Sequence, residues 1–331
     1  MALLEVDRLR VEFPTRSRAL VAVDDVSLAI EAGEVLGVVG ESGAGKSVTG
    51  AAIIGLIEPP GRMAGGEIRF DGRRIDRLSD EEKRRIRGKE IGSVFQDPLT
   101  SLNPLFTVGQ QLVETILAHS DRSADDARRH ALRLLEDVGI PAAAHRIDSY
   151  PHEFSGGMRQ RVVIALAVCA GPRLIIADEP TTALDVSIQA QIIALLKRLC
   201  RDQGTAIMLI THDMGVIAET ADRVAVMYAG RIVEVGRVRQ ILRAPNHPYT
   251  TGLMDSIPRL GRDDADLAQI DGAMPRLHEI PEGCAFHSRC PHAFDLCRRR
   301  RPVLQATGDA AAACFLFDQE RSDERRHQDS R

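Results

Sequence analysis

Short apolar runs alternate with longer amphipathic segments along most of the chain, and this order predicts an α/β fold. Apolar runs indicate buried strands at residues 34–39, 91–95, 174–178 and 206–210. Helical periodicity occurs between and after these runs, at residues 48–57, 107–118, 124–138, 154–170 and 187–200. Strands that alternate with helices in this way pack as a mostly parallel sheet with helices on both faces.

Alternation of apolar and polar residues marks further strands outside this parallel core. Residues 3–12 alternate as an edge strand would, and residues 21–30 form the next strand. Asp71-Gly72 is a favoured turn dipeptide and predicts a hairpin around it. A second hairpin is predicted within residues 224–235.

Between about residues 99 and 160 the chain has no strand pattern, which predicts a helical insertion in the α/β core. Ser123 is placed to cap the second helix of this insertion, and Gly139 followed by Pro141 is placed to end it. Upstream, Ser79 with the acidic residues after it is a capping-box start to a short charged helix.

The amino-acid composition of the chain changes near residue 240, which predicts a domain of residues 1–240 and an extension of residues 241–331. Residues 259–271 are charged and contain few large apolar side chains, as a linker does. Residues 281–315 carry four of the six cysteines. The last fifteen residues are nearly all polar or charged and are expected to be disordered.

Composition excludes several classes of protein. A net charge of -4 does not suit a general nucleic-acid binder. The longest apolar run, residues 162–171, is about half of the roughly 20 residues that a membrane span needs. The first residues lack the basic-then-apolar order of a secretory signal, so we expect a cytosolic protein. Its cysteines are then reduced or metal-bound rather than paired in structural disulfides.

A phosphate-binding loop lies between the strand at 34–39 and the helix that follows it. The pattern G-x-x-x-x-G-K-[ST] is filled by Gly40, Glu41, Ser42, Gly43, Ala44, Gly45, Lys46 and Ser47. Gly43 and Gly45 let successive backbone N–H groups face an anion, and the positive end of the next helix adds to the attraction. Lys46 would reach the β- and γ-phosphates, and Ser47 would ligate Mg²⁺. The flanking strand and helix argue against a chance glycine loop.

Other candidate residues stand at the ends of strands. Asp178 is placed to hold Mg²⁺ through a water, and Glu179 to orient and polarise the attacking water. His212 could contact the γ-phosphate, and Gln96 could sense Mg²⁺ or the water. Phe13 could stack on an adenine ring; equally, it could cover the end of the sheet. Together these groups supply the positioning and charge neutralisation that phosphoryl transfer needs, although each alone also fits an ordinary structural role.

Ser155, Gly156 and Gly157 open a helix and expose backbone N–H groups, which makes a second anion site. One compact domain does not need two such sites for one phosphate chain. A head-to-tail dimer does, because the helix of each subunit would cap the nucleotide held by the other. The alternative is a glycine-rich helix cap without a ligand.

In this order the motifs resemble those of the ATP-binding subunit of an ABC transporter. The matching segments are residues 40–47 (Walker A), Gln96 (Q-loop), 154–158 (signature motif), 174–179 (Walker B), 183–185 (D-loop) and His212 (switch histidine). The signature motif departs from the common pattern in having Phe and Met where Leu and Gln are commonest. The resemblance implies a P-loop NTPase (RecA-like) α/β core with a helical subdomain, antiparallel edge β-strands and a small cysteine-containing C-terminal extension. It also places Asp185 at the nucleotide and implies that two subunits hold two ATP molecules between them.

A narrower resemblance, to the oligopeptide/dipeptide importer subfamily, rests on residues 95–104, 247–253 and the cysteine tail. It implies a peripheral ATPase on the cytoplasmic face of the inner membrane. Its partners would be two permease subunits, a second ATP-binding subunit (its own copy or a paralogue) and an extracytoplasmic binding protein. Two alternatives are a soluble ABC ATPase of DNA repair or translation and a non-hydrolysing dimer switch. Glu179 and His212 argue against the switch.

The four cysteines of the tail, Cys284, Cys290, Cys297 and Cys314, follow the spacing C-x5-C-x6-C-x16-C. Zinc ribbons prefer C-x2-C pairs, so Zn²⁺ is not the obvious ligand. Four thiolates also suit a [4Fe–4S] cluster, and the subfamily resemblance points the same way. Zn²⁺ and ordinary buried cysteines stay open as alternatives. Cys169 and Cys200 lie on apolar helix faces and are expected to be small core residues.

Overall fold

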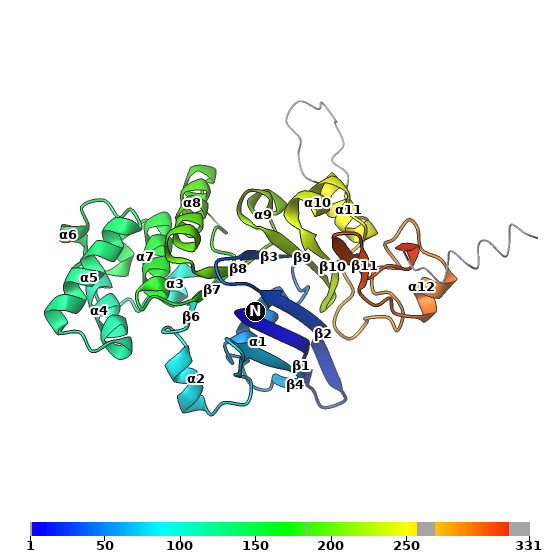
Figure 1. The fold of residues 1–331 in the computed structure, drawn as a ribbon, viewed down its shortest axis with the longest axis horizontal. Helices are drawn as coiled ribbons and strands as arrows, with labels where there is room; N and C mark the ends of the chain where they lie inside the picture. Colours follow the sequence, from blue (N-terminus) through cyan, green and yellow to red (C-terminus); the bar gives the residue numbers. More distant parts are fainter. Residues whose placement is uncertain (1, 183, 257–268, 318–331) are drawn as a thin grey trace, which may run out of the picture. The chain divides into compact units, whose positions relative to one another are not determined.

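The structure is a computed structural model that describes residues 2–182, 184–256 and 269–317 (Figure 1). The chain divides into two compact units that are interleaved in sequence. The first unit comprises Met1–Leu4, Ile30–Val35 and Arg69–Ile210, and the second comprises Glu5–Ala29, Leu36–Ile68 and Thr211–Arg331. Most of the predicted linker and of the predicted disordered tail lies outside the described residues.

Parallel strands form the centre of the first unit. Strand β7 (Leu174–Asp178) lies between β6 (Ile91–Val94) and β8 (Ala206–Thr211) and runs parallel to both. The first four side chains of β7 are buried, as expected for a strand that is covered on both faces. The polar residues predicted at the ends of β6 and β7 therefore follow neighbouring parallel strands.

Helices make up most of the rest of the first unit, which also contains the short strand β5 (Arg73–Arg74). They are α2 (Asp80–Ile86), α3 (Pro98–Ser101), α4 (Val108–His119), α5 (Ala124–Asp137), α6 (Ala143–Arg146), α7 (Gly156–Val168) and α8 (Val186–Gln203), with a 3-10 turn at Pro151–Glu153. The predicted helical insertion is confirmed: α4, α5 and α6 gather at one end of this unit (Figure 1). The Ser79 hydroxyl accepts from the Glu82 N–H in a complete capping box, and Ser123 caps α5. Among the described residues, no helix combines the length and apolarity needed to cross a bilayer.

A glycine sets how closely α7 approaches the sheet. A Cβ atom added at Gly92 of β6 would lie 2.2 Å from the carbonyl oxygen of Ala167. Real Cβ contacts are never so short. The helix that begins with the signature-like segment is thus seated on β6 at a distance that only glycine permits.

The second unit contains a sheet in which β1 (Leu4–Pro14) lies between β2 (Ala19–Ile30) and β4 (Arg62–Phe70). The prediction that residues 3–12 form an edge strand is therefore wrong. Alternation along a strand shows that one of its faces is buried, but it says nothing about how many of its edges are paired. The hairpin predicted about Asp71-Gly72 is confirmed, because Phe70 pairs with Arg73 across that two-residue turn.

The other strands of the second unit run in the order β11 (Gln305–Thr307), β12 (Ala310–Ala312), β10 (Arg231–Arg237), β9 (Arg223–Tyr228) and β3 (Val35–Val39). Strands β9 and β10 form the predicted hairpin, and β3 is parallel to β9. Strand β12 pairs with β10, so the cysteine-containing extension adds strands to this sheet. The helices of the second unit are α1 (Lys46–Ile53), α9 (Met214–Thr220), α10 (Val238–Arg243), α11 (Pro248–Asp255) and α12 (Asp295–Arg299), with a 3-10 turn at Phe315–Phe317.

The helix after the phosphate loop is shorter than the predicted range of 48–57. It ends at Ile53, and Gly55 adopts a φ of 66°. A glycine in this left-handed conformation is a common end for a helix. The apolar pattern continues to Ile57, beyond the end of the helix, because apolar character does not by itself require helical backbone geometry.

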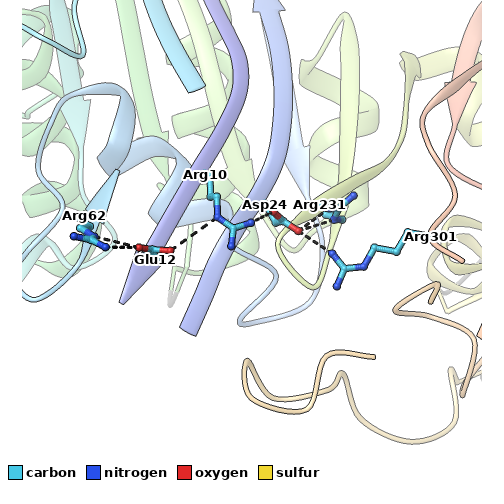
Figure 2. A network of polar contacts seen from close by, with 6 residues as sticks. All are labelled: Arg10, Glu12, Asp24, Arg62, Arg231 and Arg301. Atoms are coloured by element: carbon cyan, nitrogen blue, oxygen red, sulfur yellow. Dashed lines mark hydrogen bonds and ion pairs between the residues drawn. The ribbon is translucent and has the colours of Figure 1, made fainter. Parts of the chain in front are cut away.

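A chain of polar contacts crosses the second unit from β4 to the extension (Figure 2). Its members, in order, are Arg62, Glu12, Arg10, Asp24, Arg231 and Arg301. Asp24 on β2 is its centre, because the guanidinium groups of three arginines donate to this one carboxylate. Through Arg301, which donates to Asp24, the network connects the extension with β2.

Candidate functional site

The phosphate loop of the second unit has the backbone geometry that its sequence predicts. Gly45 has a φ of 99° and stands at the N-cap of α1. A Cβ atom at this position would lie 2.8 Å from the carbonyl oxygen of Ala22, so both the conformation and the space require glycine. Gly43 has a φ of 84°. The first turn of α1 contains no acidic residue, which leaves the positive end of the helix uncompensated and suited to an anion.

Lys46 places its ammonium group inside this loop. The residue is 5% exposed, and its Nζ donates to the carbonyl oxygens of Gly40 at 2.7 Å and Glu41 at 3.0 Å. Ser47 follows on the exposed surface of the helix. A buried cation beside backbone N–H groups fits the phosphate chain of a nucleotide, and the adjacent hydroxyl is a suitable ligand for Mg²⁺.

In the first unit, Gln96 and Glu179 meet at the carboxyl ends of two neighbouring strands. The Gln96 Nε2 donates to the Glu179 Oε2 at 3.1 Å, although the two residues are 83 positions apart. The Thr182 hydroxyl donates to the same oxygen at 2.8 Å. Sequence reasoning missed Thr182, because no pattern marks a threonine in a loop. Asp178 is the last residue of β7, directly before Glu179.

Glu179 has an unusual backbone conformation, with a φ of 47°. Residues other than glycine seldom adopt positive φ, and those that do cluster at functional sites. Two side-chain donors and this fixed backbone leave the Glu179 carboxylate in one orientation. That is what a group needs if it is to orient a water molecule.

The signature-like segment begins α7. The Ser155 hydroxyl accepts from the Met158 N–H at 3.3 Å, so it acts as a helix cap. A Cβ atom at Gly156 would meet no atom within 4 Å, whereas one at Gly157 would lie 2.8 Å from Ile188. The surface at Gly156 is therefore open, and both interpretations of this segment, cap and anion site, are compatible with the local geometry.

Three further predicted residues lie at or near the ends of strands and helices, and their contacts with a nucleotide stay predictions. His212 is exposed directly after β8, and Asp185 is the exposed N-cap residue of α8. Phe13 packs on Gly61, because a Cβ atom there would lie 2.5 Å from the phenylalanine ring. This packing favours the alternative in which Phe13 covers the end of the sheet, and adenine stacking stays a prediction.

The four cysteines of the extension surround one small cavity of about 20 Å³. All four are free thiols, and the Cys284 N–H donates to the carbonyl oxygen of Cys297 at 2.8 Å. Burial, with a smaller contribution from the neighbouring cysteines, raises the pKa of Cys284 and of Cys314 to about 11. The expected core role of Cys169 is supported by its burial, which raises its pKa to about 12.

The fit of this tetrad to a metal is mixed. Four thiols around a shared space are a suitable donor set for iron–sulfur chemistry. The space, however, is that of about one water molecule, so the turns that carry the cysteines would have to move apart to admit a cluster. Within the described residues, no group of three or more His, Cys, Asp or Glu side chains is arranged to hold a metal ion.

Comparison with known proteins agrees with these motifs. Residues 23–182 match the model of the family described as "ABC transporter", and residues 233–297 match "Oligopeptide/dipeptide transporter, C-terminal region". The chain is 48% identical to the dipeptide transport ATP-binding protein DppD of Escherichia coli K12, over 93% of this chain and 94% of that one. It is also 48% identical to the oligopeptide transport ATP-binding protein OppD of Salmonella typhimurium, over 95% and 93% of the two chains.

Solved structures show the same fold. The dimeric post-hydrolysis state of the ATP-binding cassette MJ0796, bound to ADP and Pi, has a TM-score of 0.65 and 28% identity over 71% of this chain and 99% of that one. A second dimeric structure of MJ0796 has the same TM-score. Identity of 48% over nearly the whole length decides the relationship: the chain belongs to the family of ATP-binding subunits of dipeptide and oligopeptide ABC transporters.

Proposed function

We propose that the chain is the ATP-hydrolysing subunit of an importer for di- or oligopeptides. The observation that carries the hydrolytic part is the Glu179 carboxylate, which Gln96 and Thr182 orient at the end of the strand that bears Asp178. The peptide class rests on family membership, because the relatives at 48% identity are dipeptide and oligopeptide transport proteins. The individual cargo would be selected by separate subunits.

The proposed roles follow from the chemistry of each side chain. Lys46 would neutralise charge on the β- and γ-phosphates, while Ser47, Gln96 and Asp178 would hold Mg²⁺, which would supply further charge neutralisation. Glu179 accepts a hydrogen bond from the attacking water and polarises it. As the water oxygen bonds to the γ-phosphorus, one proton of the water passes to the Glu179 carboxylate, the bond to the bridging oxygen breaks, and ADP leaves with the electron pair. His212 would contact the γ-phosphate during this step.

The second anion site is proposed to act across a dimer. Ser155, Gly156 and Gly157 would cap a nucleotide held by a second ATP-binding subunit, and Asp185 would lie beside the same interface. The dimeric structures of a related cassette support this arrangement. The second subunit would be another copy or a paralogue. Two permeases and an extracytoplasmic binding protein would complete the transporter, with this chain at the cytoplasmic face of the membrane. No nucleic acid would take part.

Substitution of Glu179 by Gln tests the hydrolytic assignment. The variant should bind ATP as the unaltered chain does, lose turnover by at least about 10²-fold as expected when a general base is removed, and accumulate as a nucleotide-bound dimer. The replacement of Lys46 by Ala should instead remove ATP binding. The matched control is Glu81→Gln, on the exposed face of α2. Unchanged turnover in Glu179→Gln would show that another residue acts as the base.

The two alternative functions give different results in simple experiments. A soluble ABC ATPase of DNA repair or translation would not co-purify with permease subunits, whereas an importer subunit would. A dimer switch that does not hydrolyse ATP would show no turnover even in the assembled complex.

For the cysteine tetrad we propose a [4Fe–4S] cluster that acts as a structural clip. Support comes from the donor set, four thiols that line one space, which would have to widen to admit the cluster; no catalytic step depends on the cluster. Protein purified without oxygen should contain about four iron atoms per chain and show broad charge-transfer absorbance. Both should disappear in Cys290→Ser and persist in Cys200→Ser, which alters a buried cysteine outside the tetrad. An iron-free, colourless preparation of the unaltered chain would show that the four cysteines are ordinary packed residues and hold no cluster.

A further inference from the structure

A residue of the phosphate loop forms an ion pair with the cysteine-containing extension. The Arg289 Nη1 donates to both carboxylate oxygens of Glu41, at 3.0 and 3.1 Å. The Arg289 side chain is 6% exposed and that of Glu41 is 30% exposed. The pair joins residues 248 positions apart within the second unit, so neither motif by itself suggests it.

Arg289 is held from every side by the extension and by β9. Its Nε donates to the carbonyl oxygen of Asp271 at 2.9 Å, and its Nη2 to that of Ile270 at 3.2 Å. The Tyr228 hydroxyl accepts from Nη1 at 3.3 Å, and the guanidinium carbon lies 5.9 Å from the centre of the Tyr228 ring. This planar, five-donor group therefore has one orientation, which a lysine could not reproduce.

The same loop residue is also held through its backbone. The Glu41 N–H donates to the Tyr249 hydroxyl at 2.9 Å, and Tyr249 is fully buried in α11. On the other side, the Glu41 carbonyl accepts from Lys46. Two positions further along the loop, the Met274 methyl group lies 3.1 Å from where a Cβ of Gly43 would be. Three residues that follow the cassette thus contact the two halves of the phosphate loop.

The ion pair has a consequence for an anionic ligand. A carboxylate within a loop that receives a polyphosphate would repel it, and the repulsion is strong where water is partly excluded. Arg289 cancels this charge and fixes the loop before the ligand arrives, which reduces the ordering that binding must impose. The turn at residues 284–290, which carries Arg289, also contains two of the four cysteines.

We propose that Arg289 and Tyr249 are positioning residues for ATP, acting on the phosphate loop through Glu41. The inference rests on the proposed function, in which this loop binds ATP. It gives the extension a direct role in nucleotide affinity, beyond its contribution to the fold. Neither residue touches the reacting atoms, so the rate at saturating ATP should not depend on them.

The test compares Arg289→Met with the unaltered full-length chain. Thermodynamic coupling between two sites of a protein is typically ~5–150-fold, and we expect the dissociation constant of a non-hydrolysable ATP analogue to rise about tenfold. The KM for ATP should rise in parallel while kcat stays the same. The dissociation constant of Arg289→Lys should lie between those of the unaltered chain and Arg289→Met. Tyr249→Phe, which preserves the ring and loses the hydroxyl acceptor, should show a smaller rise in the dissociation constant than Arg289→Met. The matched control, Arg276→Met, alters an exposed arginine of the same extension and should leave both constants unchanged.

A double-mutant cycle separates this role from simple destabilisation. If Arg289 acts through the Glu41 carboxylate, Arg289→Met should have little effect on the dissociation constant in a Glu41→Gln background. An equal rise in both backgrounds, or no rise in either, would overturn the inference. If Arg289→Met does not fold, Arg289→Lys and Tyr249→Phe provide the same comparison. Lys46→Ala distinguishes failure of the proposed function from failure of the positioning role. Retained ATP binding in Lys46→Ala would refute the proposed function. Lost ATP binding in Lys46→Ala together with normal ATP binding in Arg289→Met would refute only the positioning role.

Discussion

Asp24 should contribute measurably to stability, because one carboxylate serves three arginines (Figure 2). It accepts from Arg10 at 2.5 Å, from Arg231 at 2.6 and 3.1 Å and from Arg301 at 2.9 Å. The substitution Asp24→Asn keeps the shape and one acceptor oxygen but removes the charge. Three guanidinium groups then face one another without an anion between them.

The size of the effect follows from exposure. Breaking a fully buried ion pair costs about 3–5 kcal/mol, whereas exposed pairs are worth about 0–1 kcal/mol. The Asp24 side chain is 17% exposed, and its partners are 29–42% exposed and can recover part of their hydration. We therefore expect Asp24→Asn to lower the free energy of unfolding by about 2 kcal/mol, between these two limits.

The effect should also depend on pH, with a defined sign. Burial by itself would raise the pKa of Asp24, but the hydrogen bond and charge of Arg231, with Arg10 and Arg301, hold it below the ordinary value of 3.8. A carboxyl group with a lowered pKa in the folded state stabilises the protein above its unfolded-state pKa and loses that contribution as the pH falls. The difference between Asp24→Asn and the unaltered chain should thus be constant from pH 8 to 5 and shrink below about pH 4.

Urea-induced unfolding, followed by circular dichroism over this pH range, measures these quantities. Asp7→Asn is the matched control, because Asp7 pairs with Arg8 on the surface, where the two side chains are 62% and 75% exposed. It should change the free energy of unfolding by less than about 0.5 kcal/mol. Equal stability of Asp24→Asn and the unaltered chain at pH 7 would show that the network contributes no net stability.

Two further predictions concern buried positions. Burial lowers the pKa of His247 to about 3 from 6.5. As the pH falls, the unfolded chain therefore takes up a proton before the folded protein does, and stability is lost below pH 6.5. His247→Gln should remove about 2 kcal/mol of this loss between pH 7 and 5, and identical pH profiles of the two proteins in urea unfolding would contradict this expectation. Gly92→Ala should lower the midpoint of thermal unfolding through a cost of about 1–3 kcal/mol, the usual range for overpacking, because the added carbon would meet the Ala167 carbonyl. Gly65→Ala is the matched control, because a Cβ in that strand would make only an ordinary contact, 3.6 Å from the Cβ of Arg10.

Much of the local structure followed from the sequence because its causes act over a few residues. The capping box at Ser79, the hairpin at Asp71-Gly72 and the phosphate loop before α1 each depend on neighbours that the sequence lists side by side. The end of α1 at Ile53 was not foreseen, since the apolar pattern continues past the point where Gly55 turns the backbone.

The candidate site was foreseen as a set of residue types and motifs, and its contacts only in part. The positions of Gln96 and Glu179 directly after strands predict both as site residues, and the parallel pairing of β6 and β7 explains why the two side chains meet. Thr182 and the Glu41–Arg289 pair were not foreseen, because side chains on loops carry no periodic signal and can meet partners at any separation.

The order of apolar and polar residues by itself determined where strands, helices and the anion-binding loop form, since backbone geometry and burial of one face are set by nearby residues. Tertiary packing alone decided that β1 has neighbours on both edges, that one carboxylate gathers three arginines, and that the extension contacts the phosphate loop. These features depend on which distant segments share one sheet or one core, and that choice is made by the free energy of the whole fold rather than by any local pattern.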